Sequence, residues 1–454
     1  MIVICSSREI PFMNKTKPPF SFCKLLVIAA FLFPGFLQAQ QPDSARYHQK
    51  MQWFKDAKLG IFIHWGIYAV KGIDESWSFF NGYISHDDYM RQLEGFTAKN
   101  YDPTAWAVLI KKSGARYSVI TSKHHDGVAL WDTRLNDCSI PKGSPARKDV
   151  LTPFVNALRK EKLKVGLYYS LLDWSHEDYP NFTQKIKRYE QDSLRWQGFR
   201  TFFQGQLKEL TDQYNPDLWW FDGDWEQPAE KWESAKVRQM LLDQNPSVIL
   251  NSRLQGYGDY ATPEQGLPVT PPKADYWELC MTMNDSWGYQ YNDLNYKTPW
   301  QIIHLFADVI SMGGNLLLDI GPKADGTIPT EQVRILEELG KWTNKHGEAI
   351  FGTKAGLPPG HFYGPSTLSK DGEVLYLFVS GKPNGPVVLK GLKNQINRIR
   401  IVGNGTKLKH QVLMKQYWSE MPGIVYIDLP EHVLDDYLTV IAVQLKGPVD
   451  LWRE

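Results

Sequence analysis

Three acidic residues follow a run of bulky aromatic side chains in the stretch LWWFDGDWE, residues 218–226. Asp222 ends the apolar run, and Asp224 and Glu226 follow it at every second position. A carboxylate that a buried strand delivers to a cleft can act as a nucleophile or as a general acid and base. The glycine at position 223 allows a sharp turn, which favours Asp222 as the reactive group. The alternative is that all three acids lie in a solvated turn.

Polar residues also mark six other short segments that are rich in β-branched and aromatic residues. A single His or Trp at a strand end is as often a packed core residue, but together these positions indicate a common edge. The seven segments are 58–65, 116–126, 164–174, 217–225, 247–253, 275–280 and 315–322, and their polar residues include His64, His124, His125, Tyr169, Asp222, Arg253, Glu278 and Asp319.

Helical patterns lie between many of these segments, at residues 103–114, 181–214, 301–314 and 330–347. Apolar strands that alternate with helices indicate an α/β fold with a parallel sheet covered on both faces. Over roughly 300 residues we expect a (β/α) TIM-like barrel, with its active residues at the C-terminal ends of the strands. Seven strands imply an irregular barrel or an unrecognised eighth strand. A doubly wound open sheet is the alternative, and it would usually bring a glycine-rich phosphate loop, which the sequence lacks.

The pattern changes near residue 355, where short β-rich runs broken by Gly, Pro, Asn and Asp indicate an all-β sandwich. At the other end, an apolar stretch at 25–39 follows three lysines and predicts a signal peptide. We therefore expect a signal peptide over 1–39, a catalytic barrel over 40–354 and a C-terminal sandwich over 355–454, in a secreted or periplasmic protein. The sandwich either binds sugar or braces the barrel.

Composition restricts the partners. A net charge of +1 gives no reason to expect nucleic acid, and the mature chain shows no candidate membrane span. The 17 Trp and 22 Tyr favour carbohydrate, because aromatic faces stack on sugar C–H faces, although ordinary packing is an equal alternative. Cys138 and Cys280, the cysteines of the mature chain, make no disulfide framework. We predict no metal and no cofactor, and the sequence is silent on the oligomeric state.

The adjacent imidazoles of His124 and His125 reach one site only if the backbone curls, because neighbours in a strand face opposite sides. Metal-dependent barrels of the amidohydrolase type have a His-x-His near the first strand, whereas IHWG at 63–66 of this chain supplies only His64. Hydrogen bonding to the hydroxyls of a ligand is therefore the better hypothesis for this pair, and a metal-dependent hydrolase is the alternative.

Several motifs, in this order, resemble the α-L-fucosidases of glycoside hydrolase family 29 over roughly residues 50 to 355. They are LGIFIHWG, ESW, YSVITSKHHDGVALWDT, GLYYSLLDW, PDLWWFDGDW, TPEQ followed by WELCMTMNDSWGY, and NLLLDIGPKADGTIP. The resemblance implies a (β/α) barrel, no metal and an exo-acting, retaining enzyme that releases terminal fucose from glycans or glycosides. The alternatives are a barrel hydrolase acting on another α-L-glycoside, such as an α-L-galactoside, and a non-catalytic fucose-binding protein.

The resemblance implies that Asp222 is the nucleophile, which would form a covalent glycosyl ester. Two residues compete for the role of acid and base. We favour Glu264, in a loop after the fifth strand segment, because a loop residue can approach from the side where the aglycone leaves. Glu278, on the sixth segment, is the alternative. If Glu264 is the acid and base, Glu278 supports the site or contacts the sugar.

Further positions match residues that hold the sugar in the family. Arg253 would help to orient the nucleophile, and Trp287 would contact the methyl group at C5 that distinguishes fucose from galactose. Such a methyl contact is worth only about 1 to 3 kcal/mol, so hydroxyl contacts must supply most of the discrimination. The full set is His64, Trp65, Glu75, Trp77, His124, His125, Tyr169, Arg253 and Trp287.

Overall fold

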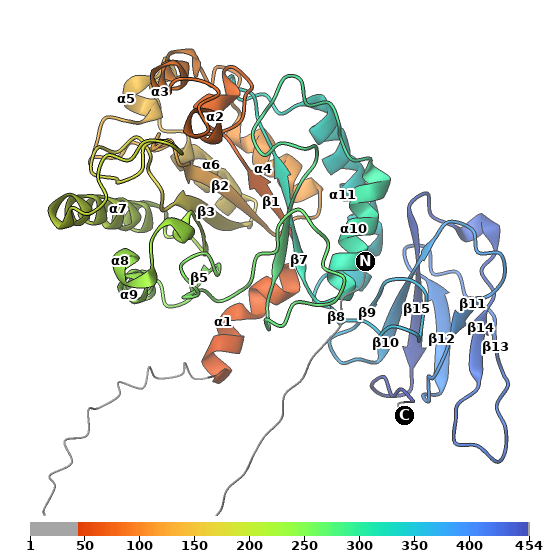
Figure 1. Ribbon diagram of the computed structural model, residues 1–454. Coiled ribbons are helices and arrows are strands. Elements are labelled where there is room, and N and C mark those ends of the chain that lie inside the picture. The colour runs from red at the N-terminus through yellow and green to blue at the C-terminus, as the bar shows by residue number, and fades with distance from the viewer. Residues whose placement is uncertain (1–43, 453–454) are drawn as a thin grey trace, which may run out of the picture. The chain divides into compact units, whose positions relative to one another are not determined.

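A parallel β-sheet forms the centre of residues 59–320 in the computed structural model, which describes residues 44–452 (Figure 1). Its strand order is β5-β4-β3-β2-β1-β7-β6. The strands are β1 (Leu59–Ile63), β2 (Tyr117–Lys123), β3 (Lys164–Ser170), β4 (Leu218–Asp222), β5 (Ile249–Leu250), β6 (Glu278–Thr282) and β7 (Asn315–Ile320). All seven predicted strand segments are confirmed, whereas the predicted signal peptide lies outside the described residues.

An irregular segment at residues 259–265 fills the gap between β5 and β6. Tyr260 forms a parallel bridge to the residue after β5, Ala261 forms one to the residue before β6, and Glu264 forms one to β6 itself. Pro263 has no N–H to donate, which helps to keep this segment from becoming a regular strand. The segment takes the eighth position of the barrel, which explains why only seven strand patterns are visible in the sequence.

Helices follow most of the strands and cover the outer face of the sheet (Figure 1). Helix α7 begins at Ser193, not near residue 181 as predicted, because Asp192 caps it by accepting from two backbone N–H groups and residues 181–187 form a short bridged loop. The helices are α1 (Ser44–Ala57), α2 (Trp77–Phe80), α3 (His86–Met90), α4 (Pro103–Lys112), α5 (Ile140–Gly143), α6 (Leu151–Lys160), α7 (Ser193–Tyr214), α8 (Ala229–Trp232), α9 (Ser234–Gln244), α10 (Pro299–Ser311) and α11 (Thr330–Ile350). Among them, none has the length and apolar character that a bilayer crossing requires.

Alternation along the strands divides the apolar side chains into two clusters. Tyr168 and Trp220 belong to the cluster inside the barrel, together with Phe62 of β1. Tyr169 and Trp219, their neighbours in sequence, belong to the cluster between the sheet and the helices. Because successive strand residues point to opposite faces, this parity decides which strand-end residues reach the barrel mouth.

Two antiparallel sheets follow α11, with strand orders β12-β15-β10-β9-β8 and β11-β14-β13. A separate apolar cluster lies between them and takes residues from both, as in a β-sandwich. The opposite face of the larger sheet packs on the barrel helices, where Trp342 Nε1 donates to the carbonyl of Leu438 at 3.2 Å. The strands are β8 (Lys354–Ala355), β9 (Ser366–Leu368), β10 (Val374–Ser380), β11 (Val387–Leu389), β12 (Ile396–Ile401), β13 (His410–Leu413), β14 (Ile424–Ile427) and β15 (Leu438–Leu445).

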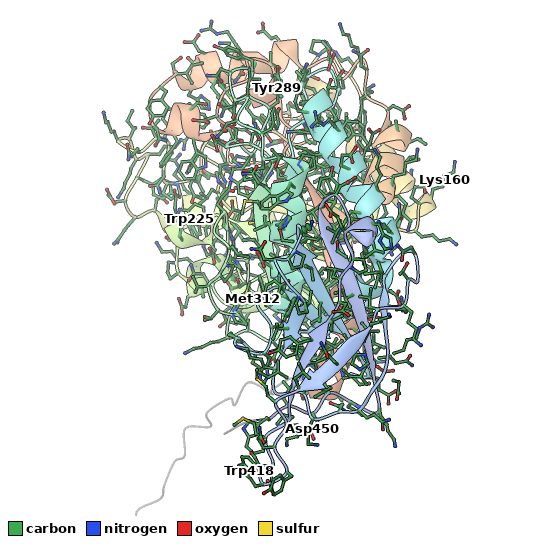
Figure 2. All side chains as sticks on the ribbon, turned by 90° about the vertical axis from the view of Figure 1, so that its right-hand side faces the viewer. Lys160, Trp225, Tyr289, Met312, Trp418 and Asp450 are labelled. Carbon is green, nitrogen blue, oxygen red and sulfur yellow. The ribbon has the colours of Figure 1, made fainter. Side chains whose placement is uncertain are left out.

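The hairpin that joins β13 to β14 carries exposed aromatic side chains at its tip (Figure 2). Trp418 is 70% exposed and lies edge-on to Tyr417, with 5.0 Å between the ring centroids. These rings are far from the strand ends of the barrel in sequence and take no part in the pocket described below.

Candidate active site

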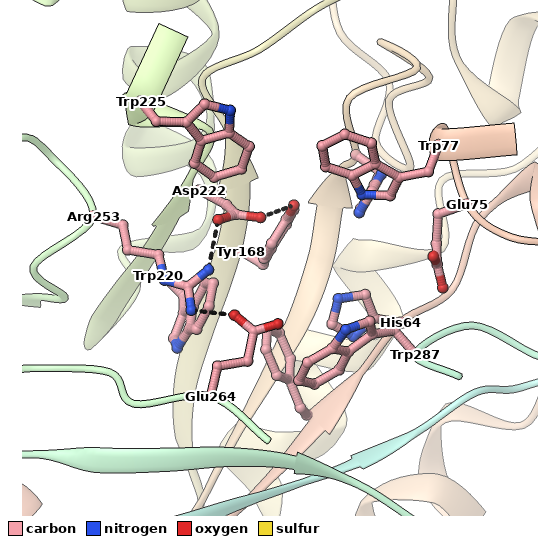
Figure 3. A pocket seen from close by; sticks show the side chains of 12 residues that line it. His64, Glu75, Trp77, Tyr168, Trp220, Asp222, Trp225, Arg253, Glu264 and Trp287 are labelled. Atoms are coloured by element: carbon pink, nitrogen blue, oxygen red, sulfur yellow. Dashed lines mark hydrogen bonds and ion pairs between the residues drawn. The ribbon is translucent and has the colours of Figure 1, made fainter. Parts of the chain in front are cut away.

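A pocket of about 550 Å³ lies at the carboxyl ends of the barrel strands (Figure 3). Aromatic rings and charged groups share its wall, an arrangement that suits a ligand with both apolar faces and hydroxyls. The lining residues are Phe62, His64, Glu75, Trp77, His124, Tyr168, Trp220, Asp222, Trp225, Arg253, Glu264 and Trp287.

Asp222 lies at the end of β4 and points into this pocket. Its Oδ1 accepts from Arg253 Nη1 at 2.8 Å, and its Oδ2 accepts from the Tyr168 hydroxyl at 3.0 Å. Gly223 follows in a left-handed conformation with φ of 84°, and a Cβ there would meet the side chain of Leu172 at 2.3 Å. The glycine is therefore required for the sharp turn that leaves the carboxylate at the mouth.

Glu264 enters the pocket from the irregular segment that closes the barrel. Its Oε2 accepts from Arg253 Nη2 at 2.5 Å, and its side chain is 39% exposed. Arg253 thus donates from its two terminal nitrogens to two different carboxylates, one from β4 and one from the closing segment (Figure 3). One guanidinium holds Asp222 and Glu264 close together, and a retaining carboxyl pair needs a separation of about 5 to 5.5 Å.

Burial and charge act in opposite directions on Arg253. Burial alone would lower the pKa of the guanidinium, but the carboxylates of Asp222 and Glu264 outweigh this effect and raise it above its ordinary value. The guanidinium therefore stays charged and holds the two acids in a fixed relation. Its plane also lies over the ring of Trp220, 4.6 Å from the centroid, which fixes it from below.

Glu278, the other candidate acid, lies in the barrel interior and not among the pocket-lining residues. Its side chain is fully buried, and it accepts from the Tyr117 hydroxyl and, at 3.0 Å, from Trp220 Nε1. Desolvation raises the pKa of Glu278 to about 7 although both hydrogen bonds lower it. Glu278 begins β6, whereas the pocket lies at the other end of the strands. It supports Trp220 from the floor of the barrel.

Three histidines meet the pocket or lie directly behind it, and each is fixed through Nδ1. His64 contacts Asp319 Oδ1 at 2.7 Å, His124 contacts Ser76 Oγ at 2.7 Å, and His125 contacts Ser170 Oγ at 2.6 Å. With Nδ1 engaged, each ring has Nε2 left for another partner, and Nε2 of His125 lies 3.8 Å from Asp222.

Burial lowers the pKa of all three rings, that of His125 to about 3, so they are neutral at ordinary pH. The hydroxyl of Ser170 donates to the carbonyl of Leu172 at 2.7 Å, so it must accept from His125. Nε2 of His125 therefore carries a lone pair, which suits acceptance from a ligand hydroxyl. The pairing of β2 with β3 shifts register between Thr121 and Lys123, just before the two histidines; His124 then lines the pocket, while His125 lies behind it beside Asp222.

Glu75 adds a third carboxyl group to the pocket wall. Its Oε1 accepts from the backbone N–H of Gly288 at 2.5 Å. Burial raises its pKa to about 7, so near neutrality it can both donate to and accept from a hydroxyl. Trp287, the residue before Gly288, packs against His64 with 5.0 Å between ring centroids, which makes an apolar wall beside the polar one.

Two predicted site residues lie outside the pocket, and both predictions are corrected here. Tyr169 points outward and donates to Gln206 of α7 at 2.7 Å, whereas its neighbour Tyr168 faces the pocket. Trp65 is buried outside the barrel, where its Nε1 donates to the carbonyl of Lys323 at 2.9 Å and its ring packs on Trp106. In both cases the alternation of the strand decides the direction of the side chain.

The structure also adds residues that the sequence interpretation missed. Phe62, Tyr168, Trp220 and Trp225 line the pocket, and Asp319, a predicted strand-end residue without an assigned role, orients His64. The parity of each strand relative to Asp222 could have identified Tyr168 and Trp220. Trp225 has no such signal, because it lies on a turn after the strand. Within residues 44–452, no cluster of three or more His, Cys, Asp or Glu side chains is arranged to hold a metal ion, and Cys138 and Cys280 are both free.

Comparisons with known proteins agree with this geometry. A family profile described as alpha-L-fucosidase matches residues 37–348. An alpha-L-fucosidase of Branchiostoma floridae is 32% identical over 362 residues, which are 73% of this chain and 79% of the relative.

Solved structures of α-L-fucosidases also superpose on this chain. Alpha-L-fucosidase isoenzyme 1 from Paenibacillus thiaminolyticus superposes with a TM-score of 0.81 and 33% identity, over 88% of this chain and all of that one. A family 29 alpha-L-fucosidase from Bacteroides thetaiotaomicron, solved as a trapped covalent intermediate with 2-fluoro-fucosyl fluoride, superposes with a TM-score of 0.78 and 28% identity over 88% of this chain and 96% of that one.

Proposed function

Since the chain belongs to the α-L-fucosidases of glycoside hydrolase family 29, we propose that it releases terminal α-L-fucose with retention of configuration, using Asp222 and Glu264. The observation that carries this proposal is the shared guanidinium: Arg253 joins two carboxylates from different elements at the mouth of one pocket. The trapped covalent intermediate of the Bacteroides relative supports a double displacement.

In the first step, a carboxylate oxygen of Asp222 attacks the anomeric carbon of fucose. The bond from that carbon to the glycosidic oxygen breaks, and Glu264 gives its proton to the departing oxygen, so the aglycone leaves as a neutral alcohol. Tyr168 and Arg253 both donate to Asp222, which fixes the direction of attack. The product of this step is a glycosyl ester on Asp222.

In the second step, the carboxylate of Glu264 takes a proton from water while the water oxygen attacks the anomeric carbon. The ester bond breaks and Asp222 is restored as a carboxylate, so two inversions give net retention. The exposed position of Glu264 supports this role, because both the aglycone and the incoming water must reach it.

The remaining pocket residues suit recognition of fucose. The fixed histidines His64, His124 and His125 and the carboxyl of Glu75 would bind hydroxyls, while Trp287 would contact the C5 methyl group. The hydrophobic stretch at residues 25–39 supports export of the enzyme from the cytoplasm as part of the same proposal.

Chemical rescue tests the two assignments separately. Asp222→Gly should abolish hydrolysis of an aryl α-L-fucoside, and azide should restore turnover with a fucosyl azide of inverted configuration as product. Glu264→Ala with azide should give the azide of retained configuration, and Glu278→Ala should give none. Rescue of Glu278→Ala in place of Glu264→Ala would contradict the choice of acid.

A further inference from the structure

The indole of Trp225 stands at the pocket mouth, three residues after Asp222. It is 51% exposed, and Figure 3 shows it across the mouth from Trp77, on the side of Asp222. A single exposed indole is ordinary on a protein surface. What distinguishes Trp225 is the number of hydrogen bonds that fix the residues on either side of it.

Asp224, the residue before Trp225, ties the turn to the loop after β5. Trp225 is the middle residue of the 3-10 turn η3 (Asp224–Glu226). Asp224 Oδ2 accepts from the backbone N–H of Gln255 at 2.5 Å. The carbonyl of Asp224 accepts from Gln255 Nε2 at 2.6 Å and from Trp232 Nε1 at 2.9 Å. Three donors from two elements therefore hold this end of the turn.

Glu226, the residue after Trp225, ties the other end of the turn to the loop after β3. Its Oε1 accepts from Trp174 Nε1 at 3.1 Å, and its Oε2 accepts from the Tyr179 hydroxyl at 2.6 Å and from Asn181 Nδ2 at 2.7 Å. Asp224 and Glu226 are not among the pocket-lining residues and are not merely solvated: both are anchors. Between them, the backbone of Trp225 has little freedom while its side chain stays open.

Glu226 also acts on Trp77, at the opposite side of the pocket mouth, through Trp174. Trp174 packs edge-on against Trp77, with 4.9 Å between centroids, so Glu226 indirectly fixes both indoles of the mouth. The rings of Trp77 and Trp225 are nearly parallel, at 13°, with centroids 6.4 Å apart. A ring held between them would need about 3.5 to 4 Å on each side, which is more than this spacing offers. A ligand must therefore lie across an exposed indole face.

We propose that Trp225 is the platform for the sugar residue to which fucose is attached, and that Asp224 and Glu226 are its positioning residues. The proposal rests on the proposed function. His64, His124 and Trp287 line the same pocket and would hold the fucose, which leaves the exposed indole of Trp225 for the leaving group. The matching chemistry is a pyranose that presents a face of C–H bonds, or a planar aromatic aglycone.

The test compares two leaving groups on the same fucosyl unit: a fucosyl hexopyranoside disaccharide, which has a face to stack, and α-L-fucosyl fluoride, which has none. Trp225→Ala should lower the ratio of kcat/KM for the disaccharide to kcat/KM for the fluoride by about 10-fold or more. Trp225→Phe should restore most of that ratio. Trp418→Ala, which removes an exposed indole outside the pocket, is the matched control and should leave the ratio unchanged.

Glu226→Gln tests the anchor. The substitution keeps the size of the side chain. It replaces one carboxylate oxygen by an NH₂ group, which cannot accept the hydrogen bonds that Tyr179 and Asn181 donate to Glu226. The ratio should fall several-fold, through KM for the disaccharide more than through kcat, and fluoride hydrolysis reports that the enzyme is folded.

A ratio unmoved by Trp225→Ala would overturn the platform alone. If the ratio is unmoved because both substrates lose equally, Trp225 lies against the fucose itself. Failure of the unsubstituted protein to hydrolyse either substrate would overturn the proposed function, and the platform with it.

Discussion

The mouth and the floor of the barrel each hold a glutamate that the sequence offers as the catalytic acid, and the two have opposite surroundings. At the mouth, Glu264 is partly exposed and shares Arg253 with Asp222. On the floor, Glu278 is fully buried beneath Trp220 and bonded to Tyr117. Depth along the barrel axis, more than residue type, therefore decides which carboxyl group can meet a substrate.

The raised pKa of Glu278 does not by itself make this residue the catalytic acid. A pKa raised to about 7 is what a general acid needs, and Glu278 has it, yet burial alone produces that shift. A perturbed pKa therefore marks a catalytic group only when the group also reaches the substrate. Access to the pocket makes Glu264 the better candidate.

The largest expected effect is at the mouth. Asp222→Gly should lower kcat/KM on an aryl fucoside by about 10⁴-fold or more, because no nucleophile remains to form the ester. Glu278→Gln should cost less than about 10-fold, since it keeps the packing beneath Trp220. Steady-state kinetics gives kcat/KM for both variants. Comparable losses of kcat/KM would contradict the distinction between a catalytic mouth and a structural floor.

The next effect separates the two glutamates. Glu264→Ala should lower kcat/KM by about 10² to 10⁴-fold on a substrate with a poor leaving group, because protonation of the departing oxygen is lost. The loss should be far smaller on a dinitrophenyl fucoside, whose leaving group needs no proton. Glu278→Ala should show no such dependence on the leaving group, and finding it there would reverse the assignment.

Glu278, on the floor of the barrel, should make the free energy of unfolding depend on pH. The pKa of Glu278 is raised from 4.5 to about 7, so between these pH values the folded protein keeps a proton that the unfolded chain has lost. The free energy of unfolding should therefore fall as pH rises through this window, by on the order of 3 kcal/mol from this group, and level off above it.

Glu278→Gln should lack this part of the pH dependence and be more stable than the unsubstituted protein at pH 8, because an amide resembles the protonated acid. Glu75 has a similar shift and stays in both proteins, so the difference between their denaturation midpoints isolates Glu278. Identical pH profiles would show that Glu278 is not held neutral.

The smallest expected effect compares two neighbouring tyrosines. Tyr168→Phe removes a hydrogen bond to Asp222 and should lower kcat by about 10-fold. Tyr169→Phe removes only the bond to Gln206 outside the barrel, so activity should stay within about twofold while stability falls by about 1 kcal/mol. The reverse pattern in kinetics and thermal denaturation would contradict the assignment of faces.

Much of the fold and part of the site follow from sequence patterns. The strand patterns predict all seven strands, because buried parallel strands read as apolar runs. The closing segment at 259–265 escapes prediction, since isolated bridges leave no periodic pattern. The same irregularity explains why the choice between Glu264 and Glu278 stays open without a structure.

The direction of side chains at strand ends is the second limit. Tyr169 and Trp65 match family positions in the linear sequence, but a shift of one residue moves a side chain from the pocket to the helix layer. Trp225 and its anchors are a third case. The partners of these anchors come from the loops after β3 and β5 and from helix α8, which no local pattern can bring together.

The most direct test of the central claim is to trap the fucosyl enzyme with a 2-fluoro-fucosyl fluoride and to locate the label by peptide mass spectrometry. We predict a single ester on Asp222, stable at neutral pH and lost when turnover resumes. A label on any other carboxylate, Glu264 and Glu278 included, would contradict the account.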